Sequence, residues 1–145
     1  MKEIIHATAV QINGAGILLR GLSGSGKSDL ALRLIDQGAV LIADDQVECQ
    51  KRKDAVFLSA PATLAGLIEI RGLGLMRLPF AADVILRLVI DLVPQEQMQR
   101  MPEAFFAQIC GDAIPCFQLC PWQASAPVKI KQFLISVLDP DRVIR

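Results

Sequence analysis

Residues 21–28, which read Gly-Leu-Ser-Gly-Ser-Gly-Lys-Ser, constrain the fold of this chain more than any other stretch. They match G-x-x-x-x-G-K-[ST] at every specified position, the pattern of a loop that wraps nucleotide phosphates. The apolar residues 17–19 precede the loop as a buried strand, and an amphipathic helix follows it. Because strand, loop and helix in this order are what the motif requires, we predict a phosphate-binding loop here.

Each residue type in this loop suits a polyphosphate. The glycines allow positive φ, so that backbone N–H groups turn toward phosphate oxygens at a helix N-terminus. The lysine adds a full charge, and the hydroxyl that follows it is placed to reach a Mg²⁺ ion bridging two phosphates. A glycine-rich turn without function would not need the complete pattern. The residues expected to bind the nucleotide are Gly21, Leu22, Ser23, Gly24, Ser25, Gly26, Lys27 and Ser28.

Composition narrows the class of protein. A chain of 145 residues suits one domain, and 52% hydrophobic with 21% charged residues is typical of a packed soluble protein. Fifteen basic residues balance fifteen acidic ones, so we expect no broad basic field for nucleic acid or an anionic membrane. Arg87 and Asp91 interrupt the longest apolar run, which argues against a bilayer span and favours the cytoplasm. The four cysteines, whose spacings fit neither a zinc site nor a redox pair, are predicted to be buried thiols.

The first half of the chain predicts an α/β fold. Residues 4–20 are expected to form a hairpin that feeds the loop, which places His6 on the neighbouring strand, where a lone histidine is more often structural than catalytic. A half-buried helix then ends at Gly38. Residues 40–43 read as a buried strand pairing in parallel with residues 17–20, which gives a βαβ unit.

Two pairs of charged residues lie where a ligand would be bound. Asp44 and Asp45 end the strand at the sheet edge where the loop is expected. Since successive side chains on a strand point to opposite faces, we expect one of them to face the phosphates or metal while the other fixes its surroundings. Glu69 and Arg71 precede a glycine-rich bend and are predicted to form a site loop, although a surface ion pair is the alternative.

The remaining elements are predicted from apolar pattern and turn residues. Residues 47–50 and 55–58 form a hairpin with a charged tip, and residues 64–67 a helical turn. Residues 84–93 form a long strand, residues 95–109 a mainly polar helix broken near Pro102, and residues 116–120 a short strand. A final helix starts at a cap at Ser125 and runs through residue 137.

Three stretches together resemble the HPr kinase/phosphorylase family: the phosphate loop, residues 40–45 (Val-Leu-Ile-Ala-Asp-Asp) and residues 67–74 (Leu-Ile-Glu-Ile-Arg-Gly-Leu-Gly). The resemblance covers most of the chain as a single catalytic domain, residues 1–145, of the short form without the N-terminal domain of longer members. It implies a P-loop kinase fold of the HPr kinase/phosphoenolpyruvate carboxykinase type, with a mixed β-sheet and flanking helices.

The resemblance also implies an activity. Such enzymes use ATP to phosphorylate a serine of HPr, a phosphocarrier protein of the phosphotransferase systems, and many reverse the reaction with phosphate. The resemblance assigns catalytic positions to His6, Lys27 and Asp45 and magnesium positions to Ser28 and Glu69. It assigns the position of an active-site arginine to Arg100. The expected site also includes Asp44 and Arg71. Long members assemble as hexamers, so the resemblance implies a homo-oligomer.

One departure from the family concerns the reverse reaction. A loop with the sequence V-[KR]-P-G-R-N is associated with dephosphorylation in the family, whereas this chain continues from Pro127-Val128-Lys129 into residues 130–132, Ile-Lys-Gln. We therefore expect little phosphorylase activity. The alternatives are a small-molecule P-loop kinase or NTPase, and a nucleotide-responsive module without phosphotransfer. A GTPase is less favoured because no N-K-x-D sequence is present.

Overall fold

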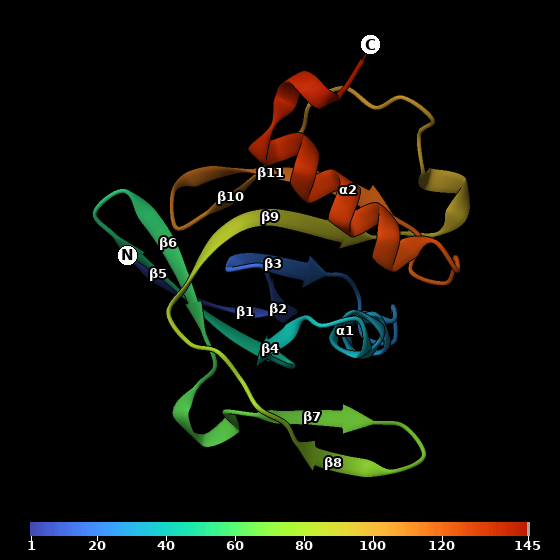
Figure 1. Ribbon diagram of the computed structural model, residues 1–145. Helices are drawn as coiled ribbons and strands as arrows, with labels where there is room; N and C mark the ends of the chain where they lie inside the picture. Colours follow the sequence, from blue (N-terminus) through green and yellow to red (C-terminus); the bar gives the residue numbers. More distant parts are fainter. Residues whose placement is uncertain (145) are drawn as a thin grey trace.

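The computed structural model describes residues 1–144 and shows a mixed β-sheet with two helices (Figure 1). Over these residues the main sheet has nine strands in the order β1-β5-β6-β9-β3-β2-β4, with β11 also pairing to β9 and β10 pairing to β11. The predicted α/β class is confirmed. The strands are β1 (Lys2–His6), β2 (Thr8–Ile12), β3 (Ala15–Arg20), β4 (Val40–Ala43), β5 (Gln46–Arg52), β6 (Ala55–Ser59), β9 (Val84–Leu92), β10 (Phe106–Ile109) and β11 (Asp112–Leu119).

The centre of the sheet is the parallel pair β3 and β9, with Leu18 opposite Val89. Side chains of β3 alternate between two cores, as the period of a strand requires. Ile17 and Leu19 pack with the helices α1 (Lys27–Asp36) and α2 (Ala126–Leu138), whereas Leu18 packs on the opposite face of the sheet. Both faces of β3 are thus buried, and the strand that leads into the phosphate loop is held firmly in place.

The helices cover one face of the sheet. The apolar stripe of α1, which includes Leu30 and Leu34, is completely or almost completely buried against the strands, as its amphipathic sequence predicts. Helix α2 contributes Ile130 and Leu134 to the same core. The ring of Phe133 stacks on Phe117 of β11 with centroids 4.4 Å apart, which anchors α2 to the edge of the sheet.

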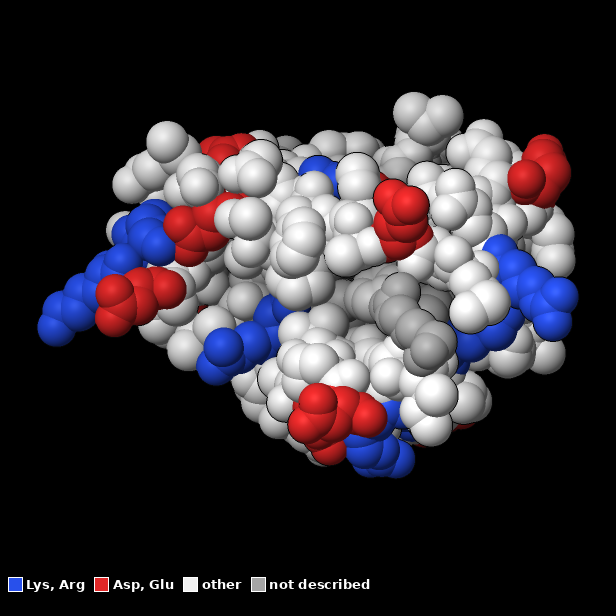
Figure 2. All heavy atoms as spheres, turned by 90° about the horizontal axis from the view of Figure 1, so that it is seen from above, with Lys and Arg blue, Asp and Glu red and all other residues white. Residues whose placement is uncertain are grey.

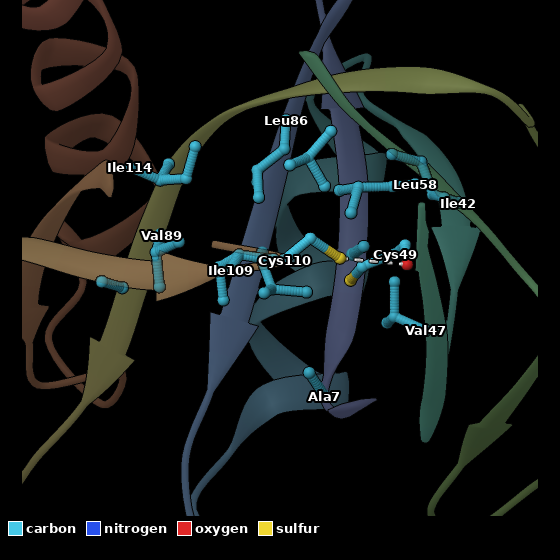
Figure 3. Packing of buried hydrophobic residues seen from close by; sticks show 14 of the residues in the cluster. Ala7, Ile42, Val47, Cys49, Leu58, Leu86, Val89, Ile109, Cys110 and Ile114 are labelled. Carbon is cyan, nitrogen blue, oxygen red and sulfur yellow. Dashed lines mark hydrogen bonds between the residues drawn. The ribbon is translucent and has the colours of Figure 1, made fainter. Parts of the chain in front are cut away.

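The second core lies on the opposite face, between β5, β6 and the β10–β11 hairpin (Figure 3). All four cysteines are free and buried, which confirms the sequence prediction. The Cys110 thiol donates a hydrogen bond to the carbonyl oxygen of Cys49 at 3.3 Å. Burial raises the pKa of the Cys49 thiol to about 12, so this thiol stays protonated near neutral pH.

The strand pairing near the loop differs from the prediction. The extended chain is interrupted at Ala7, so residues 4–20 contribute to three strands and not to two. Strand β2 is the hairpin partner of β3, whereas β1, which carries His6, pairs with β5. Strand β4 pairs antiparallel with β2 and does not contact β3 along a ladder. Strands β3 and β4 still run in the same direction, but β2 lies between them, which a local sequence pattern cannot reveal.

Three further elements correct the sequence reading. The helix expected at residues 95–109 is a single 3-10 turn, η2 (Gln95–Gln97), followed by extended chain and β10. Pro102, in the interior of the expected helix, lacks a backbone N–H and explains why no continuous helix forms. The helical turn lies earlier than expected, in η1 (Ala62–Leu64). Helix α2 begins after Ser125 as predicted, but the serine side chain makes no capping hydrogen bond.

A separate hairpin, β7 (Leu67–Ile70) with β8 (Gly74–Arg77), lies beside α1 below the main sheet in Figure 1. All four residues of β8 are exposed. Its turn contains the predicted glycine-rich bend, and the strand β7 carries Glu69. Just after the hairpin, Phe80 forms an isolated bridge with Leu41 of β4, and the Glu69 N–H of β7 donates to Asp44 at the end of the same strand.

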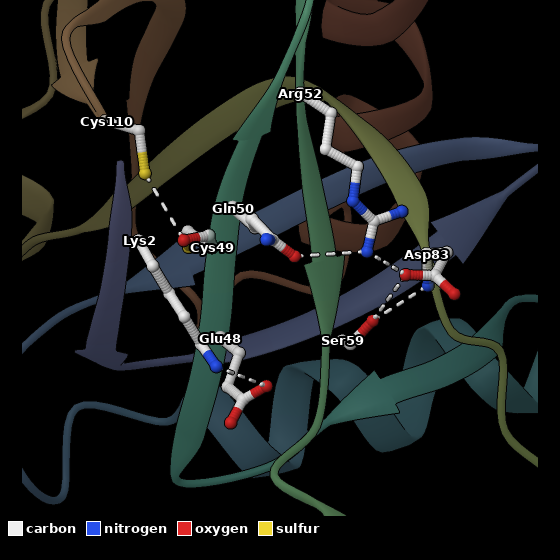
Figure 4. A network of polar contacts seen from close by, with 8 residues as sticks. All are labelled: Lys2, Glu48, Cys49, Gln50, Arg52, Ser59, Asp83 and Cys110. Atoms are coloured by element: carbon white, nitrogen blue, oxygen red, sulfur yellow. Dashed lines mark hydrogen bonds and ion pairs between the residues drawn. The ribbon is translucent and has the colours of Figure 1, made fainter.

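Charged side chains tie the outer strands together instead of forming one field. Arg52 of β5 contacts Asp83 at 2.7 Å, and Lys2 of β1 lies 3.7 Å from Glu48 (Figure 4). On the face seen in Figure 2, basic and acidic groups are interspersed. Within the part of the chain that is described, no helix combines the length and the apolar character that crossing a membrane would need.

Candidate functional site

The predicted phosphate loop connects β3 to α1 and has the geometry that its glycines allow. Gly24 and Gly26 have φ of 79° and 98°, in the left-handed region that favours glycine. Gly21 does not, contrary to expectation, but a Cβ there would lie 2.4 Å from Ser25 Oγ, so any larger residue would force the Ser25 side chain to move. The Leu30 N–H donates to the Gly26 carbonyl at 2.9 Å, so the first helical turn begins directly from the loop.

Lys27 lies at the first residue of α1 and its side chain folds back over the loop. Its ammonium group donates to the carbonyl oxygens of Gly21 and Leu22 at 2.8 and 2.9 Å. Burial lowers the pKa of Lys27, while the charges of Asp44 and Asp45 act in the opposite direction. The lysine charge is therefore held over the loop by two of the loop's own carbonyl oxygens.

Asp44 lies at the end of β4 and is nearly buried. Its Oδ1 accepts hydrogen bonds from the hydroxyls of Ser28 at 2.7 Å and Thr8 at 2.9 Å. Its Oδ2 accepts from the backbone N–H of Glu69 at 3.3 Å. One carboxylate thus joins the phosphate loop, the strand beside it and the β7–β8 hairpin.

Asp45 has partners different from those of Asp44, but both residues lie beyond the end of β4, so alternation along a strand is not the reason. Its φ of 73° turns the chain sharply into β5, and its side chain is 64% exposed. The Oδ1 atom lies 3.2 Å from His6 Nδ1, at the end of β1. The Ala7 N–H donates to the Asp45 carbonyl at 3.2 Å, which fixes β1 to this turn. His6 and Asp45 therefore form a solvent-accessible acid–base pair.

Most of the predicted residues line one pocket of about 620 Å³. Glu69, Ile70 and Arg71 enter it from the hairpin, opposite the loop. Arg100 is not among its lining residues but lies in a second groove, beside Met98 and Lys129. The sequence-predicted residues that line the pocket are His6, Ser23, Gly24, Gly26, Lys27, Ser28, Asp44, Asp45, Glu69 and Arg71.

Among the pocket residues that the sequence did not predict, two make contacts that shape the site. Thr8 occupies an otherwise apolar strand and is 1% exposed, so its hydroxyl must find a partner, which is Asp44. A buried threonine in a strand is common, and the sequence offers no sign of its partner. Trp122 comes from the distant turn between β11 and α2, yet its ring lies against Gly26. The sequence does not indicate this contact, which arises from the packing of α2 beside α1.

Comparison with known proteins places this geometry in a family. Residues 1–105 match the HPr Serine kinase C-terminal domain, a match that includes the loop, the Asp44–Asp45 turn and the β7–β8 hairpin. The HPr kinase/phosphorylase of Lactobacillus acidophilus is 38% identical over 150 residues, which cover 95% of this chain and 44% of the relative. That of Geobacillus thermodenitrificans is 41% identical over 108 residues, covering 67% of this chain and 35% of the relative.

A solved structure has the same fold. The HPr(Ser) kinase/phosphatase from Coxiella burnetii is superimposable with a TM-score of 0.79 and 26% sequence identity, covering 91% of this chain and 88% of that chain. The chain spans less than half the length of the two curated relatives above. The structural match and the family match together confirm the resemblance found in the sequence.

Proposed function

The chain belongs to the HPr kinase C-terminal domain family, and on this premise we propose that it is an ATP-dependent serine kinase acting on an HPr-like phosphocarrier protein. Residues 1–145 would act as one catalytic domain in the cytoplasm, where ATP is available. The observation that carries the proposal is the convergence of three groups on one pocket: the Lys27 ammonium over the loop, the Ser28–Asp44 pair and the His6–Asp45 pair.

Each group has a defined part in phosphoryl transfer. The loop N–H groups and Lys27 would bind the β- and γ-phosphates and stabilise the charge that builds up during transfer. The acceptor serine oxygen would attack the γ-phosphorus as the bond to the β-phosphate oxygen breaks and ADP leaves. The serine proton would pass to the exposed Asp45 carboxylate, which accepts it late in a loose transition state. His6, 3.2 Å away, would orient that carboxylate.

The donor set beside the loop fits Mg²⁺. This ion prefers oxygen ligands and usually takes one or two carboxylates together with substrate phosphates and water. Ser28 Oγ and Asp44 Oδ1 lie 2.7 Å apart, and the backbone N–H of Glu69, on the hairpin, donates a hydrogen bond to the same carboxylate. Ser28 and Glu69, with Asp44 added, would hold the ion, which would supply positive charge against the phosphates. We therefore add Asp44 to Ser28 and Glu69, the two magnesium ligands expected from the sequence.

The direct test is a transfer assay. Purified protein is mixed with ATP, Mg²⁺ and the HPr-like proteins of the host, and mass spectrometry locates any phosphate added. Phosphate on an HPr serine supports the proposal. Transfer only to a small molecule, or ATP binding without transfer, would replace it with one of the two alternatives given by the sequence.

Lys27→Met provides the matched variant, since it keeps the buried stem and removes the charge. We expect turnover to fall about 10²–10³-fold, the usual cost of losing one group that stabilises transition-state charge. Circular dichroism should show an unchanged fold. Self-association, implied only by family resemblance, is tested separately by light scattering of the same preparation.

A further inference from the structure

The turn that connects β11 to α2 packs directly on the phosphate loop. A Cβ placed on Gly26 would lie 3.0 Å from Trp122 Cη2 and 3.2 Å from Pro121 Cγ, so the loop and the turn are in close contact. The Trp122 side chain is otherwise exposed, at 64%, and it lines the pocket that contains Lys27 and Ser28. The turn thus forms one wall of the candidate nucleotide site, although it is about a hundred residues away in sequence.

Arg33 holds this turn to the helix that carries the site. One η nitrogen of its guanidinium donates to the Pro121 carbonyl at 2.5 Å, and the other lies 3.5 Å from the Gln123 carbonyl. The ε nitrogen donates to Asp29 Oδ2 at 3.0 Å, within α1. The planar guanidinium therefore holds backbone groups on both sides of Trp122, a geometry that suits arginine and not lysine.

The turn also makes side-chain hydrogen bonds to elements other than α1. The side-chain amide of Gln123 donates to Gln95 at 3.1 Å and accepts from Lys129 at 2.9 Å, which joins the turn to η2 and α2. Within residues 1–144, Arg33 links the turn by side-chain hydrogen bonds to α1, whose first turn supplies Lys27 and Ser28. Loss of Arg33 would leave the turn attached to the far groove but free to move from the loop.

We propose that Arg33 is a positioning residue for nucleotide binding, because it fixes Trp122 against Gly26 and thereby sets the width of the phosphate pocket. The nucleotide part of this inference rests on the proposed function. Asp29, which also lines the pocket, orients the guanidinium through the i,i+4 pair. Arg33 itself is not among the residues that line the pocket, so its effect on the reaction is through the turn.

The test distinguishes an effect on the position of Trp122 from an effect on phosphoryl transfer itself. Trp122 is the only tryptophan in the chain, so its fluorescence reports on this turn alone. In Arg33→Met without nucleotide, we expect a larger acrylamide quenching constant and lower anisotropy. In transfer assays we expect the KM for ATP to rise about tenfold, in line with the loss of charge-assisted hydrogen bonds, while kcat changes little. Arg33→Lys keeps the charge without the planar fork, so its quenching constant and its KM for ATP should stay close to those of Arg33→Met.

Lys131→Ala is the matched control. Lys131 donates to Gln37 Oε1 at 3.1 Å and so also links α2 to α1, but at the other end of that helix. Its quenching and KM should equal those of the wild type. Unchanged Trp122 quenching in both folded Arg33 variants would overturn the positioning role. Absence of ATP binding by the wild type would instead overturn the proposed function, and the quenching comparison would still decide whether Arg33 holds the turn.

Discussion

The hydroxyl of Thr8 donates a hydrogen bond to Asp44 Oδ1 over 2.9 Å, and the two side chains are 1% and 8% exposed. The same oxygen accepts from Ser28, so Thr8 sets the direction in which the carboxylate faces the loop. A buried carboxylate that loses one of its hydrogen-bond donors can rotate or shift, and it pays a desolvation penalty.

Thr8→Val tests this relationship, because valine keeps the shape and removes the hydroxyl. We expect the free energy of unfolding to fall by about 1–3 kcal/mol, as for a buried polar group left without a partner. The Mg²⁺ concentration needed for half-maximal turnover should rise. Thr8→Ser, which retains the hydroxyl, is the control; equal Mg²⁺ dependence in the valine variant and the wild type would show that Thr8 does not act on Asp44.

The two aspartates at the end of β4 should respond differently to neutralisation. Asp45→Asn is expected to lose turnover while ATP binding persists, since it removes the exposed carboxylate beside His6. Asp44→Asn should lose less turnover and show the larger increase in Mg²⁺ requirement, because Asp44 contacts Ser28. Single-turnover rates at saturating Mg²⁺ make the comparison, and a larger loss at Asp44 would exchange the two roles.

Local patterns in the sequence were sufficient for the loop, for α1 and for the long strand β9. The different surroundings of Asp44 and Asp45 were expected from alternation along a strand, but the two residues follow the strand, and the turn at Asp45, with φ of 73°, separates their partners. Long-range pairing was not predictable: nothing near Val40 indicates that β2 separates it from β3. Gly26 likewise carries no sign of Trp122, because that contact depends on how two helices pack side by side.

At residues 95–109 the sequence predicted a helix where no α-helix forms. The residues of this segment apart from Pro102 have adequate helix propensity, but a proline in the interior of a helix removes a backbone hydrogen bond and clashes with the preceding turn. The chain instead forms η2, an extended stretch and β10, whose Ala107 and Ile109 enter the second core. Arg100, expected near the nucleotide, is carried by this extended stretch to a different groove. Its catalytic role stays a prediction.

The buried Cys49 thiol predicts a loss of stability in alkali. Its pKa is raised from 9.0 to about 12 by burial, so between these values the unfolded chain loses a proton that the folded chain keeps. The contribution is fully present below pH 9 and is lost as pH rises toward 12. Urea unfolding from pH 8 upward should give a steeper decline for the wild type than for Cys49→Ala, by up to about 1.4 kcal/mol per pH unit. Parallel declines would contradict this account.

The reverse reaction is expected to be slow. In it, an oxygen of inorganic phosphate would attack the phosphorus of phosphoserine and release pyrophosphate and the serine hydroxyl, which requires two anions to be held together. The lysines that stand in place of the family's arginine loop lie in α2 and donate to Gln123 and Gln37, away from the pocket. Incubation of phosphorylated HPr with Mg²⁺ and phosphate measures pyrophosphate release; a rate comparable with the kinase reaction would refute this expectation.

The β7–β8 hairpin has a consequence for amide hydrogen exchange. The amides of β3 and β9 are enclosed between two cores, so their protons should exchange only when the whole domain unfolds. The hairpin is a sheet of two strands whose outer strand is fully exposed, and its amides should exchange by local opening at a much lower free energy. Glu69 therefore belongs to the readily opening part of the domain, whereas Lys27 and Ser28 belong to the slowly exchanging part. Opening of the hairpin would break the hydrogen bond from the Glu69 N–H to Asp44 but no strand pairing of the main sheet.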